Sequence, residues 1–461
     1  MRIQIKNIGQ IEDASVDLDG ITVIAGENNT GKSTIGKTVF ALLRGMDEWK
    51  ELYFSLCEKN VKAVMEKKSQ LLEEFCLAHT NAYRRRTNRA NELLNELCTD
   101  GNFIVFIEDH QVVGDDKVYG RLKEYCRDYI ALYQKNDAEQ MINSHIKFIN
   151  GWMEEVIAEL NQIELDEVAL QSGFVKNSFH SCFKGQYITE GEECSEVLFT
   201  DTSRTTVLKL SASASSLSAP IRFEPGVYFI ESPKIFDEIG PAVQGRDALK
   251  MLMIPNTFLN TAVRKRTEQQ MSLWDTYLSY LEDEIPKEAE QVLAMLCQAM
   301  GGKADYYAKE GIKFKENGAK GTLYPQNVST GVKALAFLEY TVRLGVIQKK
   351  DILILDEPEI NLHPQWQIVY ARALVLLQKA YGLTLIITTH SPYFLRALEC
   401  FTDKYGVMNQ LNVYYVSKDN GHRHRIKNMM NSEYGMTELY EILSSAFDQL
   451  QDEIDSLYAE E

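Results

Sequence analysis

The sequence predicts an α/β fold built on a mainly parallel sheet. The first support is a glycine-rich segment, residues 26–34, which follows a short apolar run and opens a helical pattern. The second is the alternation of strand-like and helix-like stretches over the last third of the chain. The third is an apolar run that ends in two adjacent acids, in DILILDEPEINLHP, residues 351–364. Such alternation is typical of parallel strands covered by helices.

Composition indicates an ordinary globular protein. The chain has 461 residues, of which 45% are hydrophobic and 25% charged. Its longest apolar runs, such as residues 383–387, are far shorter than the roughly 20 residues that cross a bilayer. The first ten residues lack the apolar core of a signal peptide. We therefore expect no membrane association and a cytoplasmic location.

The charge balance disfavours whole-surface binding of nucleic acid, because 66 acidic residues outnumber 49 basic ones. Basic clusters at residues 83–89, 263–266 and 422–427 could bind nucleic acid or an acidic partner, although a solvated helix face is the commoner role of such clusters. The eight cysteines are scattered without a Cys-x-x-Cys pair, so we expect buried thiols and no zinc site.

The pattern divides the chain into five segments. Residues 46–178 are mostly helical, with one strand-like stretch at 102–108, and residues 211–220 are serine-rich like a loop or linker. We expect an N-terminal half of the main domain with the phosphate loop (1–45), an α-helical insertion (46–178), β segments that complete a β-rich N-terminal lobe (179–234), a second helical insertion (235–320) and a C-terminal lobe (321–461).

The segment GENNTGKS fits the phosphate-loop pattern G-x-x-x-x-G-K-[ST] between a strand and a helix. In this motif successive backbone amides and a helix N-terminus surround phosphates. Lys32 would reach the β- and γ-phosphates, and Ser33 would bind Mg²⁺. The predicted nucleotide contacts are Gly26, Glu27, Asn28, Asn29, Thr30, Gly31, Lys32, Ser33 and Thr34.

Asp356 and Glu357 end an apolar strand, at the edge where ligands of parallel sheets bind. Because adjacent side chains on a strand point in opposite directions, we expect them to have separate tasks. Asp356 would hold the Mg²⁺, and Glu357 would orient and deprotonate the attacking water. An acid pair in a turn is the plain alternative.

Two further segments are spaced to join this edge. His390 ends the apolar run LTLIITT, after room for one helix and one strand. Ser329, Thr330 and Gly331 open a predicted helix and form a second candidate anion site. Taken singly, the histidine suits a structural role and the Ser-Thr-Gly a helix cap.

Together these motifs resemble ABC-type ATPases, in the branch that contains the SMC, RecF and OLD-type proteins. The resemblance rests on GENNTGKST, VSTGVKA, ILILDEP with EINLHP, and IITTHSPYF. It implies a P-loop NTPase head that binds ATP and Mg²⁺ and hydrolyses ATP slowly. It also implies that two heads enclose ATP between them, with Ser329 and Gly331 acting on the opposing head's γ-phosphate and His390 sensing it. The signature departs from the usual leucine-serine-glycine-glycine-glutamine form at Val328, Thr330 and Val332.

The resemblance also narrows the branch. No aromatic residue precedes the phosphate loop, unlike in ABC transporters, and the 71 residues after His390 leave no room for the nuclease domain of OLD proteins. The chain is similar to stand-alone ATPase subunits of anti-phage systems such as Septu, PARIS and some retrons. A homodimer or higher oligomer that controls a separate effector, a nuclease or toxin, is the implied function. A RecF-like ATPase of DNA repair is the alternative.

Two further residues, Glu231 and His363, each have two possible roles. Glu231 follows the strand VYFI roughly where this family places a Mg²⁺-contacting glutamine, but a strand that stops at Pro233 is the preferred explanation. His363 falls in the loop that follows the acids in this family and runs along the contact between heads. We expect it to report on the opposing head, with a surface histidine as the alternative.

Overall fold

The protein was examined as a computed structural model. It describes residues 1–46, 166–240, 249–255, 285–418 and 424–459, apart from single gaps at 203, 224, 251, 308 and 433, and short helical pieces between 59 and 159. The chain forms two compact units, one of Met1–Asp47 with Gln171–Glu461 and the other of Glu48–Leu170.

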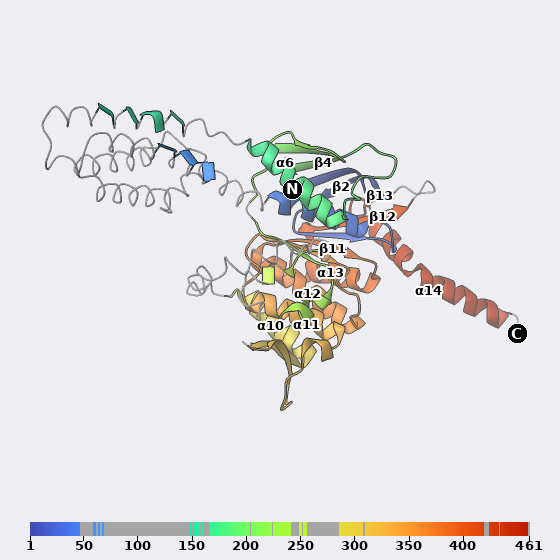
Figure 1. Cartoon of the computed structure of the whole chain (residues 1–461). Coiled ribbons are helices and arrows are strands. Elements are labelled where there is room, and N and C mark those ends of the chain that lie inside the picture. The colour runs from blue at the N-terminus through green and yellow to red at the C-terminus, as the bar shows by residue number, and fades with distance from the viewer. Residues whose placement is uncertain are drawn as a thin grey trace. The chain divides into compact units, whose positions relative to one another are not determined.

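An eleven-stranded sheet organises the first unit (Figure 1). Its strand order is β6-β5-β4-β1-β2-β13-β12-β3-β11-β10-β7. The strands are β1 (Arg2–Ile8), β2 (Ile11–Asp17), β3 (Ile21–Ala25), β4 (Cys194–Asp201), β5 (Arg204–Ser211), β6 (Ser215–Leu217), β7 (Val227–Ile230), β10 (Ile352–Asp356), β11 (Thr384–Thr389), β12 (Leu411–Lys418) and β13 (His424–Asn428).

The section β12-β3-β11-β10-β7 is parallel throughout. Strands β3, β7 and β11 are buried along their whole length, as expected for parallel strands covered on both faces. The remaining pairs are antiparallel except β2 with β13, so the whole sheet is mixed. The predicted α/β fold of P-loop NTPases with a β-rich N-terminal lobe is confirmed.

Helices cover both faces of the parallel section. One face supplies Val23, Leu353 and Leu385 to a core shared with four helices, which gather together in Figure 1. They are α10 (Lys287–Met300), α11 (Thr330–Arg343), α12 (Pro364–Tyr381) and α13 (Pro392–Lys404). On the opposite face, Phe40 of the helix over residues 32–46 packs edge-on against Phe229 of β7, with ring centroids 5.8 Å apart.

This arrangement brings three carboxyl ends together. Strands β3, β10 and β11 are neighbours and run in the same direction, so the residues that follow Ala25, Leu355 and Thr389 meet at one edge of the sheet. The phosphate loop, the two acids and His390 therefore leave the sheet at the same place.

Two sequence-based expectations were wrong in this unit. The serine-rich stretch contains β6, which pairs antiparallel with β5 at the sheet edge, because small polar residues tolerate an edge position with one exposed side. The expected helical segment 235–320 contains an antiparallel hairpin of β8 (Gly302–Tyr307) and β9 (Gly311–Glu316) after α10. Gly301, at φ 63°, ends that helix and starts the hairpin.

The other described elements are α6 (Glu167–Phe183), α14 (Gly435–Ala459) and the short 3-10 helices Pro233–Glu238, Pro325–Asn327 and Met408–Gln410. None of the helices among the described residues is long and apolar enough to cross a membrane.

The described pieces of the second unit are helical. Trp152 donates its indole Nε1–H to the carbonyl of Lys68, 2.8 Å away. The Lys68 ammonium lies 3.0 Å from Glu155 and 2.9 Å from Glu159. The predicted strand at 102–108 and the basic clusters at 83–89 and 263–266 lie outside the described residues.

Candidate functional site

The phosphate loop forms a closed turn between β3 and the helix over residues 32–46. Asn29 and Gly31 adopt positive φ angles of 61° and 90°, and the Thr30 hydroxyl donates to the Glu27 carbonyl at 2.8 Å. Alternation of left- and right-handed backbone makes successive amides point into a concave nest. The loop therefore presents backbone donors and a helix N-terminus to one small volume.

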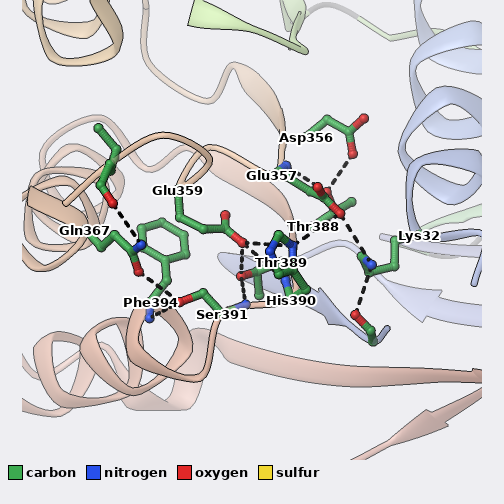
Figure 2. A network of polar contacts seen from close by, with 12 residues as sticks. Lys32, Asp356, Glu357, Glu359, Gln367, Thr388, Thr389, His390, Ser391 and Phe394 are labelled. Carbon is green, nitrogen blue, oxygen red and sulfur yellow. Dashed lines mark hydrogen bonds and ion pairs between the residues drawn. The ribbon is translucent and has the colours of Figure 1, made fainter. Parts of the chain in front are cut away.

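Lys32 is buried at the centre of this loop, with only 3% of its surface exposed. Its ammonium donates to the carbonyls of Gly26 at 2.9 Å and Glu27 at 2.7 Å. It also lies 3.4 Å from Oε1 of Glu357 (Figure 2). One cation thus connects the phosphate loop with the residue that follows β10.

Ser33 and Asp356 meet across the same edge. The Ser33 hydroxyl donates to Oδ1 of Asp356 at 2.8 Å, and the Thr388 hydroxyl of β11 donates to the same oxygen at 2.6 Å. Burial raises the pKa of Asp356 above its ordinary value, and the hydroxyls of Thr388 and Ser33 oppose this effect. Hydroxyl and carboxylate oxygens are the ligands that Mg²⁺ prefers, so this pair fits that ion.

The magnesium site would be open and shared with phosphate. Among the described residues no group of three His, Cys, Asp or Glu side chains could hold a metal by itself. Mg²⁺ commonly keeps waters and is bound by one or two protein groups together with substrate phosphates. Two protein oxygens, from Ser33 and Asp356, are consistent with that mode.

Glu357 takes its direction from an unusual backbone conformation. It lies just beyond the strand at φ 50°, and its amide donates to the hydroxyl of Thr388 at 2.9 Å. Strand alternation alone was expected to point the side chains of Asp356 and Glu357 in opposite directions, and this was wrong. Glu357 lies beyond the strand in a left-handed conformation, and its carboxylate lies beside Lys32. A non-glycine residue in this region costs on the order of 1–3 kcal/mol and is typical of functional sites.

His390 lies between two carboxylates at the end of β11 (Figure 2). Its Nδ1 is 3.5 Å from Oε1 of Glu357 and 3.7 Å from Oε1 of Glu359. The neighbouring Glu357 raises the pKa of His390, and His390 in turn lowers the pKa of Glu357 below its ordinary value, with Lys32 adding to the effect. The pair therefore favours an imidazolium beside a carboxylate, and 40% of the histidine side chain stays exposed.

Glu359 is a residue that the sequence did not single out. It is 3% exposed, and its Oε1 accepts from the Thr389 hydroxyl at 2.6 Å and the His390 amide at 3.2 Å. Its Oε2 is buried without a hydrogen-bond partner among the described residues, and burial raises the pKa of the carboxyl. In the sequence Glu359 is marked only by its position three residues after Asp356, and this does not distinguish it from a surface glutamate.

His424 is a second residue that was missed. It lies on β13, is buried, and places Nδ1 2.5 Å from the carbonyl of Thr30. This contact ties the phosphate loop to strand β13. The sequence showed it only within a basic cluster.

Ser329, Thr330 and Gly331 begin α11, as predicted. Ser329 caps the helix by accepting from the Val332 amide at 3.4 Å. A Cβ on Gly331 would lie 2.9 Å from the Trp366 ring, so a larger residue there would force that ring to shift. None of the three lines the pocket at the phosphate loop in this chain.

His363 caps α12, and its Nδ1 accepts from the Gln365 amide at 3.3 Å. This local contact explains a histidine there, and its role toward an opposing head stays a prediction.

Glu231, just beyond β7, pairs with Lys37 at 3.1 Å and lies near enough to Asp356 to act on its charge. The structure thus places Glu231 beside the site.

A pocket of about 290 Å³ opens over the loop. Among the described residues its lining consists of Gly9, Gln10, Asn29, Thr30, Gly31, Lys32, Ser33, Thr34, Phe183, Gln186 and Glu357. The volume is close to the lower bound for small-molecule sites, about 300 Å³. Of the predicted contacts, Gly26, Glu27 and Asn28 do not line it; the first two supply the carbonyls that hold Lys32.

Sequence models of two families match parts of the chain. The model described as "AAA domain, putative AbiEii toxin, Type IV TA system" matches residues 245–396, and one described as "AAA domain" matches residues 2–50. A comparison with curated proteins finds no match. The two matched ranges cover less than half of the chain and contain the phosphate loop, the two acids and His390.

Solved structures similar to the chain include SMC head domains. The SMC head domain from Thermotoga maritima is 11% identical, with 93% of this chain and 97% of that chain covered and a TM-score of 0.34. An Smc head with an extended coiled coil, bound to the C-terminal domain of ScpA and derived from Pyrococcus furiosus, is 10% identical, with 96% and 98% covered and a TM-score of 0.38. Because these scores are low, the fold assignment rests on the strand order, the phosphate loop and the matched AAA models.

Proposed function

We propose that this protein binds ATP with Mg²⁺ at the edge formed by β3, β10 and β11, and hydrolyses it to ADP and phosphate. The observation that supports this most strongly is that Lys32 and His390 both lie within 3.5 Å of one carboxylate oxygen of Glu357, although the three residues follow three different strands. Separate elements rarely place a buried cation, a strained acid and a histidine around one point without a shared function.

Each residue has a definite task in this proposal. The amides of residues 29–34 bind the phosphates, and Lys32 exchanges its loop carbonyls and Glu357 for the β- and γ-phosphate oxygens. Ser33 and Asp356 would hold Mg²⁺, which would supply positive charge beside the phosphates. Glu357, released from Lys32, orients the attacking water and accepts its proton.

His390 would donate to the γ-phosphate. Because Glu357 raises its pKa, the imidazole carries a proton more readily near neutral pH and can act as a cationic donor. Loss of the γ-phosphate after hydrolysis would leave His390 paired with Glu357 again. In this way the histidine reports the state of the nucleotide.

A second copy of the chain would complete the site. Ser329 is exposed at the start of α11 and does not line the pocket of its own chain, which supports action on the nucleotide of an opposing head. Three apolar side chains are also exposed in the C-terminal part of the chain: Ile360 in the loop after the acids, Ile368 in α12 and Tyr393 in α13. Exposed apolar residues suit a surface that another protein covers.

The oligomer would control a separate effector, a nuclease or toxin, in anti-phage defence. The description of the model that matches residues 245–396 names a toxin and a type IV toxin–antitoxin system, which supports a role beside a toxic activity. Direct binding of nucleic acid, as in a RecF-like protein, stays the alternative.

Calorimetric titration with ATP and Mg²⁺ tests the nucleotide site. Lys32→Ala should weaken binding at least tenfold, because it removes the only side-chain cation lining the described pocket. Lys68→Ala is the matched control, since that lysine is equally buried and ion-paired but belongs to the other unit. Equal ATP affinity in the Lys32→Ala variant and the wild type would disprove the proposal.

A further inference from the structure

The residues that line the pocket over the phosphate loop fall into two chemically different groups. Glu357 and Lys32 are charged and lie 3.4 Å apart, where the proposed γ-phosphate reacts. Phe183, Gln186, Gly9 and Gln10 also line the pocket, and none of them is charged. A phosphate chain does not need an aromatic ring or uncharged amides, so this second group suits a different part of a ligand.

The uncharged lining residues come from segments that are distant in sequence. Helix α6 ends at Phe183, and the turn after it is closed by the Gln186 amide, which donates to the Phe183 carbonyl at 3.0 Å. The turn is fixed to the loop between β1 and β2, because the Gly9 amide donates to the Tyr187 carbonyl at 2.9 Å. A Cβ on Gly9 would lie 3.2 Å from Thr34, so this loop in turn rests on the phosphate-loop helix.

Phe183 is held in a defined position. Its ring stacks on the buried ring of Phe179, with centroids 6.0 Å apart and planes inclined by 16°. Phe183 itself is only partly buried, so part of the ring stays available to a ligand. It is also the only aromatic residue in the described lining of the pocket.

The glutamines add hydrogen-bonding capacity beside the ring. Gln10 and Gln186 are both exposed, and neither side-chain amide has a hydrogen-bond partner among the residues described. An amide offers both donors and an acceptor, which matches the mixed edge of a nucleobase.

We infer that Phe183, with Gln10 and Gln186, forms the subsite for the base of the bound nucleoside triphosphate. This inference rests on the proposed nucleotide site and adds to it the residue that distinguishes a nucleotide from a bare phosphate chain. The base stacks on the exposed part of the Phe183 ring, and the triphosphate runs past Gly9 and Thr34 toward Lys32. The sequence before the phosphate loop lacks an aromatic residue, and Phe183 supplies one from another part of the chain.

Two probes, ATP and inorganic tripolyphosphate, test the subsite by calorimetric titration of the full chain with Mg²⁺. Phe183→Ala should weaken ATP binding by about 5- to 100-fold, the range expected for loss of one base–aromatic stack. It should leave the affinity for tripolyphosphate within about twofold. Phe183→Tyr, which keeps the ring, should bind both probes like the wild type.

Other outcomes separate this inference from the proposed function. Unchanged ATP affinity in Phe183→Ala, or an equal loss for both probes, would overturn the base subsite while leaving a Lys32-dependent phosphate site in place. If the wild type binds neither probe, both proposals fail. Should Phe183→Ala fold poorly, Phe183→Leu retains an apolar contact with Phe179 and carries the same expectation of selective ATP loss.

Discussion

Replacing Glu357 with glutamine removes one negative charge beside Lys32 while keeping nearly the same side-chain volume. The carboxylate oxygen lies 3.4 Å from the ammonium, and ATP must displace this interaction to reach Lys32. At that distance a unit charge pair is worth about 1 kcal/mol in a water-like dielectric, the appropriate limit for a partly exposed glutamate. Glu357→Gln should therefore bind ATP about fivefold more tightly.

The same substitution should nearly abolish hydrolysis. Glutamine cannot accept the proton of the attacking water, and loss of a general base lowers rates by about 100- to 10,000-fold. The assay is single-turnover hydrolysis of radiolabelled ATP with enzyme in excess, combined with calorimetric titration of ATP. Single-turnover conditions separate the chemical step from product release.

The rate of hydrolysis and the affinity for ATP each test the role of Glu357. If the variant hydrolyses ATP within tenfold of the wild type, Glu357 is not the base. If it binds ATP more weakly, Glu357 does not compete with the phosphates for Lys32.

Two further substitutions test the remaining polar groups of the site. Asp356→Asn keeps an acceptor for Ser33 but removes the charge, so the Mg²⁺ concentration for half-maximal hydrolysis should rise by about 10- to 100-fold; an unchanged Mg²⁺ requirement would remove Asp356 from the metal site. Glu359→Gln addresses pH dependence. Burial raises the pKa of Glu359 in the folded protein, so its contribution to stability is present below about pH 4.5 and is lost as pH rises through the folded pKa. The variant should melt at a higher temperature than the wild type at pH 7.5, with a smaller difference at pH 4.5; a constant difference at both pH values would contradict this.

The sequence predicted which segments meet where the buried parallel strands end. The strands that end at Ala25, Asp356 and Thr389 are continuous apolar runs, whereas a strand buried on one face alternates apolar and polar residues. A parallel sheet places the carboxyl ends of all three at one edge. The phosphate loop adds a motif whose backbone geometry is fixed by its glycines. These local signals predicted Lys32 and Ser33 without knowledge of the pairing order.

The remaining parts depend on contacts between distant segments. Phe183 reaches the pocket only because Tyr187 pairs with Gly9, and His424 reaches Thr30 because β13 lies beside β2. No local pattern records either pairing. The same holds for β6, whose strand conformation comes from hydrogen bonds to β5, and serine-rich composition alone favoured a loop.

The direction of Glu357 was also beyond the sequence pattern. Glu357 has a positive φ and its amide donates to the Thr388 hydroxyl, and side-chain alternation along a strand does not predict such a residue. Glu359 acquires its importance only through burial, which its position in a polar loop did not indicate.

The central claim is that one site, built at the ends of β3, β10 and β11, hydrolyses ATP. Its most direct test is release of phosphate from ATP by the purified wild-type protein, with Lys32→Ala and Glu357→Gln measured in parallel. We expect Mg²⁺-dependent release by the wild type, no release by Lys32→Ala because ATP does not bind, and bound but intact ATP in Glu357→Gln. Equal phosphate release by all three proteins would contradict it.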